Sequence, residues 1–529
     1  MTDTLDIEVL DTTLRDGAQG EGIVFSLRDK LAVAETLDEL GAAWIEAGNP
    51  GSNPKDLEFF RNASSLKLKN SKLCAFGSTR KKGIKPDDDS QLRSLLSAET
   101  EGVVIFGKSW DLHVTQILHA QLEENLAMIS DTIEFLKAQG RTVLYDAEHF
   151  FDGFAANPDY ALLTLKTAVN AGADSIVLCD TNGGCLTDTI VNAVGEVKKA
   201  LPGVRIGIHA HNDAGLALAN AIAAVQAGCT HVQGTLVGFG ERCGNTSLAA
   251  LIPSLELKLG LSCLPKGNLA RIGEFTRRVA EIANVIVSDD MPYVGAHAFS
   301  HKAGMHVDGI IKNRISFEHI NPADVGNERH LLMSEVGGRS AIAERVKKVD
   351  QSVDKDHPAV ISLAKKIKKM EAAGWAFEGA DASLEILIRQ ELGCYKPFFN
   401  IEAYRVFSEH PANEKIKCSH AWVKVLVGDQ TEIAAAESVG PVGALDEALR
   451  RALTRFFPGL AKVRLEDYKV RVIDGKDATS AQVRVLIEST DGSRKWNTVG
   501  VSADIIDASR AALVDSIEFL LIKGEEGRI

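Results

Sequence analysis

Two histidines separated by one residue are the first feature of this sequence that could do chemistry. His209 and His211 end an apolar run, and an Asn-Asp pair follows them. Alternate residues of a strand face the same way, so both imidazoles can point to one side. Asp16, in DTTLRDG, ends the first apolar run and can supply a carboxylate from another strand. Two imidazoles and one carboxylate predict a divalent-metal site with positions left for water and substrate.

This ligand set leaves both the metal and the enzyme class open. Two histidines and a carboxylate also form the iron site of non-haem oxygenases, although two histidines on one barrel strand weigh against that alternative. Zn, Mn and Co accept these ligands, and Mg does so when water completes its shell. Asn245, in GFGERCGNTSL, is a candidate to complete the metal shell.

Other polar side chains stand where apolar runs end. Arg15 precedes Asp16, and its guanidinium suits a carboxylate or a developing oxyanion, with a salt bridge that closes the barrel as the alternative. Glu148 ends the fifth run, where a carboxylate can orient a substrate or transfer a proton. Thr181 ends the sixth run, where its hydroxyl can hold a substrate carboxylate or cap a turn.

Eight short apolar runs alternate with helical patterns in the first half of the chain and must position these residues. The runs are 7–13, 43–48, 72–77, 102–107, 142–148, 174–181, 204–211 and 230–236. Amphipathic stretches such as 29–41 and 125–140 lie between them. Eight strand–helix units predict an α/β fold, a (β/α)8 TIM barrel, over residues 1–285. A doubly wound open sheet is the alternative, but each run ends in a polar cluster, as at the active-site end of a barrel.

The rest of the chain has two parts. Residues 286–395 hold HAFSHKAGMHVDG and long charged helical stretches, which predict a linker made of helical subdomains. Residues 396–529 repeat one pattern, in the segments 421–430, 438–453, 481–490 and 498–513. Two copies of a ββα unit predict a pseudo-symmetric α+β domain. The repeat offers no catalytic cluster, which favours a binding or regulatory role, with simple oligomerisation as the alternative.

Composition limits the partners and the compartment. The net charge of −13 over 529 residues argues against nucleic acid and anionic membranes as partners. No apolar stretch approaches the ~18 residues of a membrane span, and the N-terminal residues lack a signal-peptide core. The eight cysteines are scattered without a CxxC pair. We therefore expect a reducing compartment, the cytoplasm, and no disulfide framework.

Four motifs in order resemble the DRE-TIM metallolyases, the family of the isopropylmalate, homocitrate and citramalate synthases and their lyase relatives. The motifs are DTTLRDGAQ (11–19), HAHND (209–213), GERCGN (240–245) and HKAGMHVDG (301–309). The resemblance covers essentially the whole chain. It implies Claisen condensation of acetyl-CoA with a 2-oxo acid at a divalent metal. It also implies that residues 396–529, which include GPVGALDEAL (440–449), form an allosteric domain that binds an end-product amino acid across a homodimer.

Within this family, three segments resemble the citramalate synthase branch, whose 2-oxo acid is pyruvate. They are AGNPGSNPKDLEFF (47–60), FGKSWDLHV (106–114) and YDAEHFFDGFAANPDYAL (145–162). The resemblance implies that Asp16, His209 and His211 bind the metal and that Asn245 lies close to it. It also implies that Tyr145 lies near the substrate pocket.

The resemblance assigns the remaining roles to the two substrates. Arg15 and Thr181 would bind pyruvate. Glu148, His306 and Asp308 would handle the methyl proton of acetyl-CoA, with His306 as the base and Asp308 as its support. Because His306 lies outside the barrel motifs, it must come from the linker region of the same or of the partner subunit. The alternative is that His306 and the weaker candidate His301 are ordinary linker residues.

Other activities stay open at this point. The same chemistry on 2-oxoisovalerate or 2-oxoglutarate would give isopropylmalate or homocitrate. A lyase would run the reverse cleavage, but it has no use for a domain that senses an end product. A non-catalytic amino-acid sensor is disfavoured because Arg15, Asp16, His209 and His211 are all retained. The expected effector is isoleucine, towards whose biosynthesis citramalate leads, with leucine as the alternative.

Overall fold

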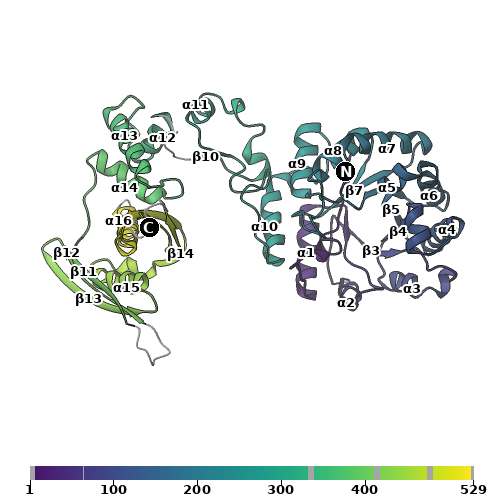
Figure 1. The fold of residues 1–529 in the computed structure, drawn as a ribbon, viewed down its shortest axis with the longest axis horizontal. Coiled ribbons are helices and arrows are strands. Elements are labelled where there is room, and N and C mark those ends of the chain that lie inside the picture. The colour runs from purple at the N-terminus through teal and green to yellow at the C-terminus, as the bar shows by residue number, and fades with distance from the viewer. Residues whose placement is uncertain (1–5, 64, 332–338, 410–417, 474–480, 526–529) are drawn as a thin grey trace. The chain divides into compact units, whose positions relative to one another are not determined.

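The computed structural model describes residues 6–63, 65–331, 339–409, 418–473 and 481–525, which form two compact units (Figure 1). The first unit spans Met1–Phe299 and Ile320–Arg329. The second unit spans Ser300–His319 and His330–Ile529. Residues 286–299 and 320–329, which the sequence assigns to the linker, therefore pack with the barrel. Tyr293 shows one such contact, since its hydroxyl lies 2.9 Å from the hydroxyl of Ser254.

The first unit is built on a closed barrel of eight parallel strands, which confirms the predicted fold. The strands are β1 (Glu8–Asp11), β2 (Trp44–Glu46), β3 (Lys72–Ser78), β4 (Gly102–Lys108), β5 (Thr142–Glu148), β6 (Ser175–Asp180), β7 (Ile206–Ala210) and β8 (His231–Gly234). The barrel closes where β8 pairs with β1, with Val9 opposite Val232. Each strand lies within its predicted run or extends it by one residue. The apolar runs therefore located the strands well.

Helices surround these strands and bury their apolar faces against them (Figure 1). They are α1 (Leu27–Leu40), α2 (Pro54–Ala63), α3 (Ser90–Ser97), α4 (Leu122–Ala138), α5 (Phe150–Ala156), α6 (Pro158–Asn170), α7 (Thr187–Ala200), α8 (Ala217–Ala227), α9 (Leu248–Leu259) and α10 (Ile272–Ile282). Single turns of other helix types are η1 (Gly17–Gln19), η2 (Pro86–Asp88), η3 (His113–Ile117), η4 (Leu269–Arg271) and η6 (Pro322–Val325). Helix α1 shows why such helices begin and end where they do. Ser26 and Asp29 form a capping box at its start, and Gly41 ends it at a φ of 94° that favours glycine.

The second unit begins with small elements and helices. Strand β9 (Ser300–His301) pairs in parallel with β10 (His330–Leu331). The helices are α11 (Gly304–Lys312), η5 (Arg314–Ser316), α12 (Arg339–Val349), α13 (Pro358–Ala372) and α14 (Asp381–Glu391). Their buried side chains, among them Val307, Ile342 and Leu363, share one hydrophobic core.

The repeat that follows contains one strand more per copy than the sequence predicts. The first copy is β11 (Asn400–Glu409), β12 (Cys418–Val427), β13 (Gln430–Ser438) and α15 (Pro441–Thr454). The second, after the turn η7 (Pro458–Lys462), is β14 (Arg464–Val472), β15 (Val483–Thr490), β16 (Lys495–Ser502) and α16 (Ile505–Glu525). Each copy is a three-stranded antiparallel sheet with a helix packed on it. Most side chains of β11 and β14 are exposed or half-buried, so these strands lack the apolar alternation that reveals the others.

The helices and the cysteines bear on whether the chain crosses a membrane or contains disulfides. Within the described residues, every helix falls short of the length and apolar character needed to cross a membrane. All eight cysteines are free thiols, and Cys243 and Cys394 are the exposed ones.

Candidate metal centre

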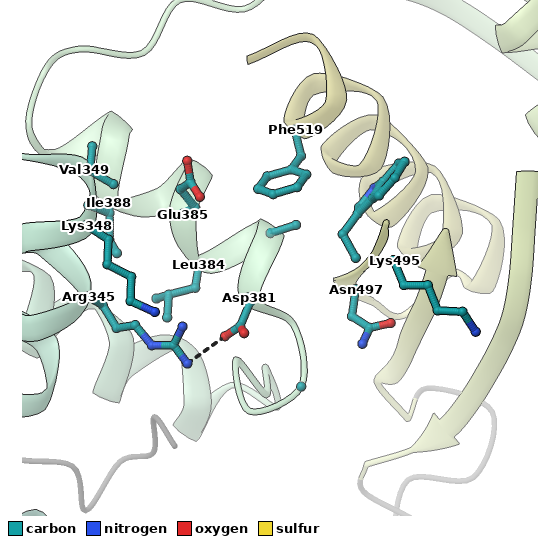
Figure 2. A pocket seen from close by; sticks show the side chains of 13 residues that line it. Arg345, Lys348, Val349, Asp381, Leu384, Glu385, Ile388, Lys495, Asn497 and Phe519 are labelled. Atoms are coloured by element: carbon teal, nitrogen blue, oxygen red, sulfur yellow. Dashed lines mark ion pairs between the residues drawn. The ribbon is translucent and has the colours of Figure 1, made fainter. Parts of the chain in front are cut away.

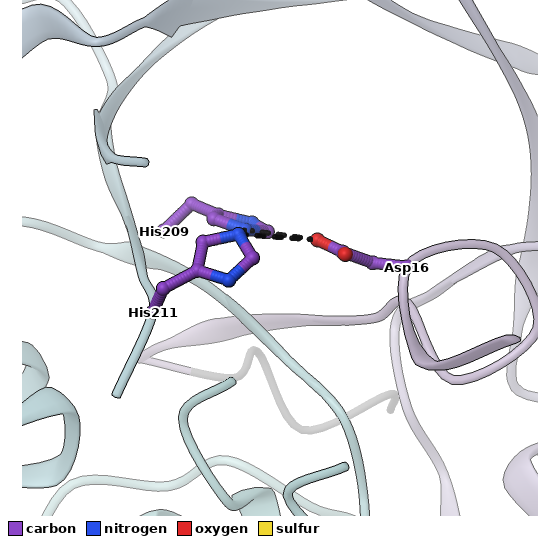
Figure 3. Close-up of side chains that lie close together, drawn as sticks. All are labelled: Asp16, His209 and His211. Carbon is purple, nitrogen blue, oxygen red and sulfur yellow. Dashed lines mark hydrogen bonds and ion pairs between the residues drawn. The ribbon is translucent and has the colours of Figure 1, made fainter. Parts of the chain in front are cut away.

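Asp16, His209 and His211 come together where strands β1 and β7 end (Figure 3). One ligand atom from each residue lies within 4.8 Å of the others, and all three side chains are buried. Asp16 Oδ2 lies 3.1 Å from His209 Nε2 and 3.7 Å from His211 Nε2, and the two Nε2 atoms are 3.4 Å apart. This arrangement presents three donor atoms to one point and leaves further coordination positions open.

The electrostatics of the three side chains favour a cation at that point. Burial opposes ionisation of Asp16, yet Arg15 and the two imidazoles hold the pKa of its carboxyl well below the usual range. Burial lowers the pKa of His209, but the hydrogen bond with Asp16 and the charges of Asp16 and Asp146 together outweigh burial and raise it. Burial and the neighbouring His209 lower the pKa of His211 to about 4. A carboxylate facing a neutral imidazole with a free lone pair is a donor set that divalent metals bind.

Asn245 gives an independent test of whether a metal fits. Its side chain is buried, it forms an isolated backbone bridge with His211, and neither its Oδ1 nor its Nδ2 has a hydrogen-bond partner. A buried polar group without a partner costs about 1–3 kcal/mol. A metal or its water would satisfy the amide oxygen, so the residues present fit a divalent cation.

Arg15 is fixed beside this site from two sides. Its Nε donates to Glu46 Oε2 at 2.6 Å, and its guanidinium lies over the ring of Phe76, 3.8 Å from the centroid. Burial opposes the charge of Arg15, but Glu46 and Asp16 raise its pKa above the ordinary value. Arg15 therefore does form a salt bridge inside the barrel, with Glu46. The same side chain also lines the cavity next to the candidate metal ligands, and the salt bridge orients it there.

A cavity of about 250 Å³ opens next to the three ligands. Its lining comprises Arg15, Asp16, Gln19, Phe76, Phe106, Asp146, Glu148, Cys179, Thr181, His209, His211 and Glu241. Phe76 and Phe106 stack with ring centroids 5.2 Å apart and give it an apolar wall. The structure thus brings six of the predicted residues to one small cavity, which suits a small polar molecule with an apolar end.

Glu148 and Thr181 each interact with another residue, and each side chain keeps atoms that could still bind a ligand. The carboxylate of Glu148 forms an ion pair with Lys108. The hydroxyl oxygen of Thr181 accepts a hydrogen bond from the backbone N–H of His149 at 2.9 Å. Since that bond uses the oxygen as acceptor, the hydroxyl proton of Thr181 can still be donated to a ligand.

Tyr145 is not among the residues that line this cavity. Its side chain is fully buried in the hydrophobic core and does not line the cavity. Side chains alternate along a strand, and on β5 the residues that line the cavity are Asp146 and Glu148. In this structure Asp146 and Glu148 line the cavity and Tyr145 does not, so the substrate-binding role of Tyr145 stays a prediction.

His306 and Asp308 lie on α11, in the second unit. His306 is exposed and stacks on Phe317, with ring centroids 4.3 Å apart. Asp308 Oδ2 lies 2.6 Å from Lys312 Nζ. The weaker candidate His301 is half-buried, with its Nε2 3.3 Å from Glu318 Oε1. Their part in catalysis stays a prediction.

Three buried polar residues near the candidate ligands are not predicted from the sequence. Glu46 holds Arg15, and Gln233 Oε1 lies 2.8 Å from His209 Nδ1. Gln233 Nε2 donates to Asp146 Oδ1 at 3.0 Å. Burial raises the pKa of Asp146 to about 7. The available signal was a polar residue inside an apolar run, as in AWIEAG and THVQGTL.

The second unit has a cavity of its own, of about 280 Å³ (Figure 2). Side chains from α12, α14, β16 and α16 line it, with apolar groups such as Leu384 and Phe519 and an ion pair of 3.0 Å between Arg345 and Asp381. Four of its lining residues, Lys495, Trp496, Asn497 and Phe519, lie in residues 396–529, the part of the chain that is expected to bind the effector. The other lining residues lie in residues 286–395.

Comparison with known families divides the chain into three parts. Residues 6–279 match the HMGL-like family. Residues 293–374 match the homocitrate synthase post-HMGL domain-like family. Residues 378–521 match the LeuA allosteric (dimerisation) domain.

Comparison with individual proteins gives similarity over almost the whole length. The chain is 49% identical to (R)-citramalate synthase from Aquifex aeolicus, a match that covers 98% of both chains. It is 46% identical to (R)-citramalate synthase from Geobacter sulfurreducens, again over 98% of both. With 2-isopropylmalate synthase from Methanocaldococcus jannaschii the identity falls to 30%, over 98% of this chain and 96% of the other.

Proposed function

This chain belongs to the (R)-citramalate synthase family, and we propose that it condenses acetyl-CoA with pyruvate and water to give (R)-citramalate and CoA. The observation that carries this proposal is the identity of almost half of all residues with relatives of that name, over nearly the full length of both chains. The small cavity beside the Asp16–His209–His211 cluster supports it, because a three-carbon oxo acid needs little space.

We further propose that Asp16, His209 and His211 hold a divalent metal and that Asn245 completes its surroundings. When bound, such a metal acts as a Lewis acid that draws electron density from a ketone oxygen. Mg, Mn, Zn and Co all suit two imidazoles, one carboxylate and water. The unpartnered amide of Asn245 and the lowered pKa of His211 support this assignment.

Arg15 and Thr181 would bind and orient pyruvate. The guanidinium of Arg15, held by Glu46, keeps further N–H groups that can donate to the substrate and to the alkoxide that forms from its ketone. The hydroxyl of Thr181 would donate to the carboxylate of pyruvate. Phe76 and Phe106 would exclude water from one side of the cavity.

Carbon–carbon bond formation needs a base for the methyl group of acetyl-CoA. His306 would accept that proton, with Asp308 as its support and Glu148 as a third group near the reacting carbons. The enolate then attacks the ketone carbon of pyruvate, and water hydrolyses the thioester to release CoA. Family resemblance carries these three assignments.

Measuring CoA release with a panel of 2-oxo acids tests the proposed substrate. The panel holds pyruvate, 2-oxoisovalerate and 2-oxoglutarate, each with acetyl-CoA and divalent metal. We expect kcat/KM to be highest for pyruvate. A strong preference for 2-oxoisovalerate or 2-oxoglutarate would overturn the proposal in favour of an isopropylmalate or homocitrate synthase.

We also propose a homodimer regulated by an amino acid. The match of residues 378–521 to an allosteric dimerisation domain supports both parts. Isoleucine is the expected effector and leucine the alternative. Light scattering should give the mass of a dimer, and isoleucine should raise the melting temperature of the protein. A monomeric mass, or no shift with any branched-chain amino acid, would contradict the respective part.

A further inference from the structure

Gln233 lies directly beside one of the candidate metal ligands. In the register of the barrel, His209 on β7 stands opposite Gln233 on β8. Both side chains are buried, at 5% and 1% exposure. A glutamine amide inside a barrel must satisfy its hydrogen bonds with protein groups, so its partners define which way it points.

The two ends of this amide have different partners. Gln233 Oε1 lies 2.8 Å from His209 Nδ1, and Gln233 Nε2 lies 3.0 Å from Asp146 Oδ1. Both bonds are buried, and they link three strands of the barrel, β7, β8 and β5. The chain of contacts therefore runs from Asp146 through Gln233 to the imidazole of His209.

The direction of these hydrogen bonds follows from the chemistry of the groups. An ionised carboxylate only accepts hydrogen bonds, so Asp146 takes the N–H of the amide. The amide oxygen then faces His209 and only accepts, so Nδ1 of His209 must carry the proton. Once Nε2 releases the proton that it donates to Asp16, the imidazole is neutral and its lone pair lies on Nε2, the atom that faces Asp16 and His211.

We propose that Gln233 and Asp146 are positioning residues that hold His209 in the tautomer whose Nε2 can bind a divalent metal. This inference rests on the proposed metal-dependent function. Groups that receive the second N–H of a metal-binding histidine fix its tautomer and ring orientation, and their loss typically weakens metal binding about 10- to 100-fold.

His211 provides an internal contrast. Its Nδ1 is buried and has no hydrogen-bond partner among the described residues. Hydrogen bonds with the protein therefore select the tautomer of one of the two histidines and not of the other. Changes at Gln233 and Asp146 should accordingly act on metal affinity through His209.

The test measures metal binding rather than activity. Metal-free protein is titrated with Co²⁺ or Zn²⁺ against a chromophoric chelator at pH 8, where Asp146, with a pKa of about 7, is mostly ionised. Gln233→Leu removes the acceptor and should raise the metal dissociation constant about 10- to 100-fold. Asp146→Asn lets the amide of Gln233 turn around and should have a smaller effect in the same direction.

A double variant reverses the hydrogen bond between positions 146 and 233, keeps the acceptor for His209 Nδ1 and should restore binding. In Gln233→Glu/Asp146→Asn, the new carboxylate accepts from His209 Nδ1 and the new amide donates to that carboxylate. We expect its metal affinity to return to within several-fold of the wild type, a rescue that mere filling of space would not produce. Gln226→Leu, on the exposed face of α8, is the matched control and should bind metal normally.

The outcomes separate this inference from the function on which it rests. The positioning role would be overturned if folded Gln233→Leu bound metal as tightly as the wild type, or if the folded double variant did not regain metal affinity. Neither result would contradict the proposed citramalate synthase activity. Should Gln233→Leu fail to fold, Asp146→Asn decides, because it keeps the side-chain volume and a folded Asp146→Asn variant with unchanged metal affinity would overturn the role. A wild-type protein that turns over fully without divalent metal would instead overturn the proposed metal function.

Discussion

The candidate metal site of the barrel and helix α11 present their histidines in opposite ways. His209 and His211 are buried and face the carboxylate of Asp16, whereas His306 on α11 is exposed and stacks on Phe317. A metal ligand must keep one geometry through every turnover, while a base must reach its substrate. The barrel thus fixes the positions of His209 and His211 before a substrate binds, whereas the exposed His306 is free to approach one. Two changes test this difference directly, and two more test charged groups in the same two units.

Loss of a fixed ligand should have the largest effect. We expect His209→Ala to lower kcat/KM at least ~10⁴-fold, since a Lewis acid contributes several kcal/mol to the transition state. Circular dichroism should show a folded barrel, and metal analysis should show loss of bound metal. His231→Gln is the matched control, because His231 is also buried in the barrel but pairs with Glu8. Normal activity of His209→Ala would refute the metal assignment.

Loss of the exposed histidine should act on turnover alone. His306→Asn removes the proposed base, and we expect kcat to fall about 10²- to 10³-fold, as is typical of general-base catalysis. Metal affinity and melting temperature should stay at wild-type values, because His306 is exposed. His297→Asn, another exposed histidine, serves as the control. If His306→Asn also lost bound metal, His306 would not act on turnover alone and would not differ from His209 in this respect.

Arg15→Lys keeps the charge of a fixed residue and removes its planar fork of donors. Lysine cannot satisfy Glu46 and the substrate at once, so kcat/KM for pyruvate should fall about tenfold to fiftyfold, the value of one hydrogen bond to a charged group. Steady-state kinetics with pyruvate as the varied substrate measures this. Arg205→Lys, at an exposed pair with Glu8, should leave kcat/KM unchanged. Equal kinetics in both variants would show that charge alone matters at position 15.

The smallest effect concerns a buried carboxyl of the second unit. Burial raises the pKa of Glu518 to about 7, although its carboxylate accepts from the backbone N–H of Phe398. Because an unfolded Glu titrates near pH 4.5, the second unit should lose about 2 kcal/mol of stability as the pH rises from about 4.5 to 7. Glu518→Gln should remove that loss and raise the melting temperature at pH 7.5. Thermal unfolding from pH 5 to 8 measures both, and an unchanged slope in the variant would contradict the assignment.

The sequence predicted the barrel and the ligand cluster because both leave strong local signals. Each barrel strand is an apolar run, and Asp16, His209 and His211 stand at strand ends that a closed barrel brings together. Strands β11 and β14 were missed because their side chains are mostly exposed or half-buried.

Residues inside the barrel were harder to predict. Whether Tyr145 or Asp146 faces the cavity depends on one step of register, and the run TVLYDAE alone does not fix it. Glu46 and Gln233 belong to no quoted motif. Their roles become visible only when the closed barrel brings β2 beside β1, which precedes Arg15, and β8 beside β7, which carries His209.

The candidate ligands lie far apart in the sequence of the barrel: Asp16 follows β1, His209 lies on β7 and His211 directly follows β7. During synthesis Asp16 leaves the ribosome long before His209, so the cluster cannot exist until the first and seventh strands belong to one closed ring. A cation that binds only this closed ring would lower the population of open forms in proportion to its free concentration. The concentration of free metal in the cell would then influence how long the protein survives as well as how fast it turns over. Metal-free protein would populate open forms more often, and proteases would degrade it faster.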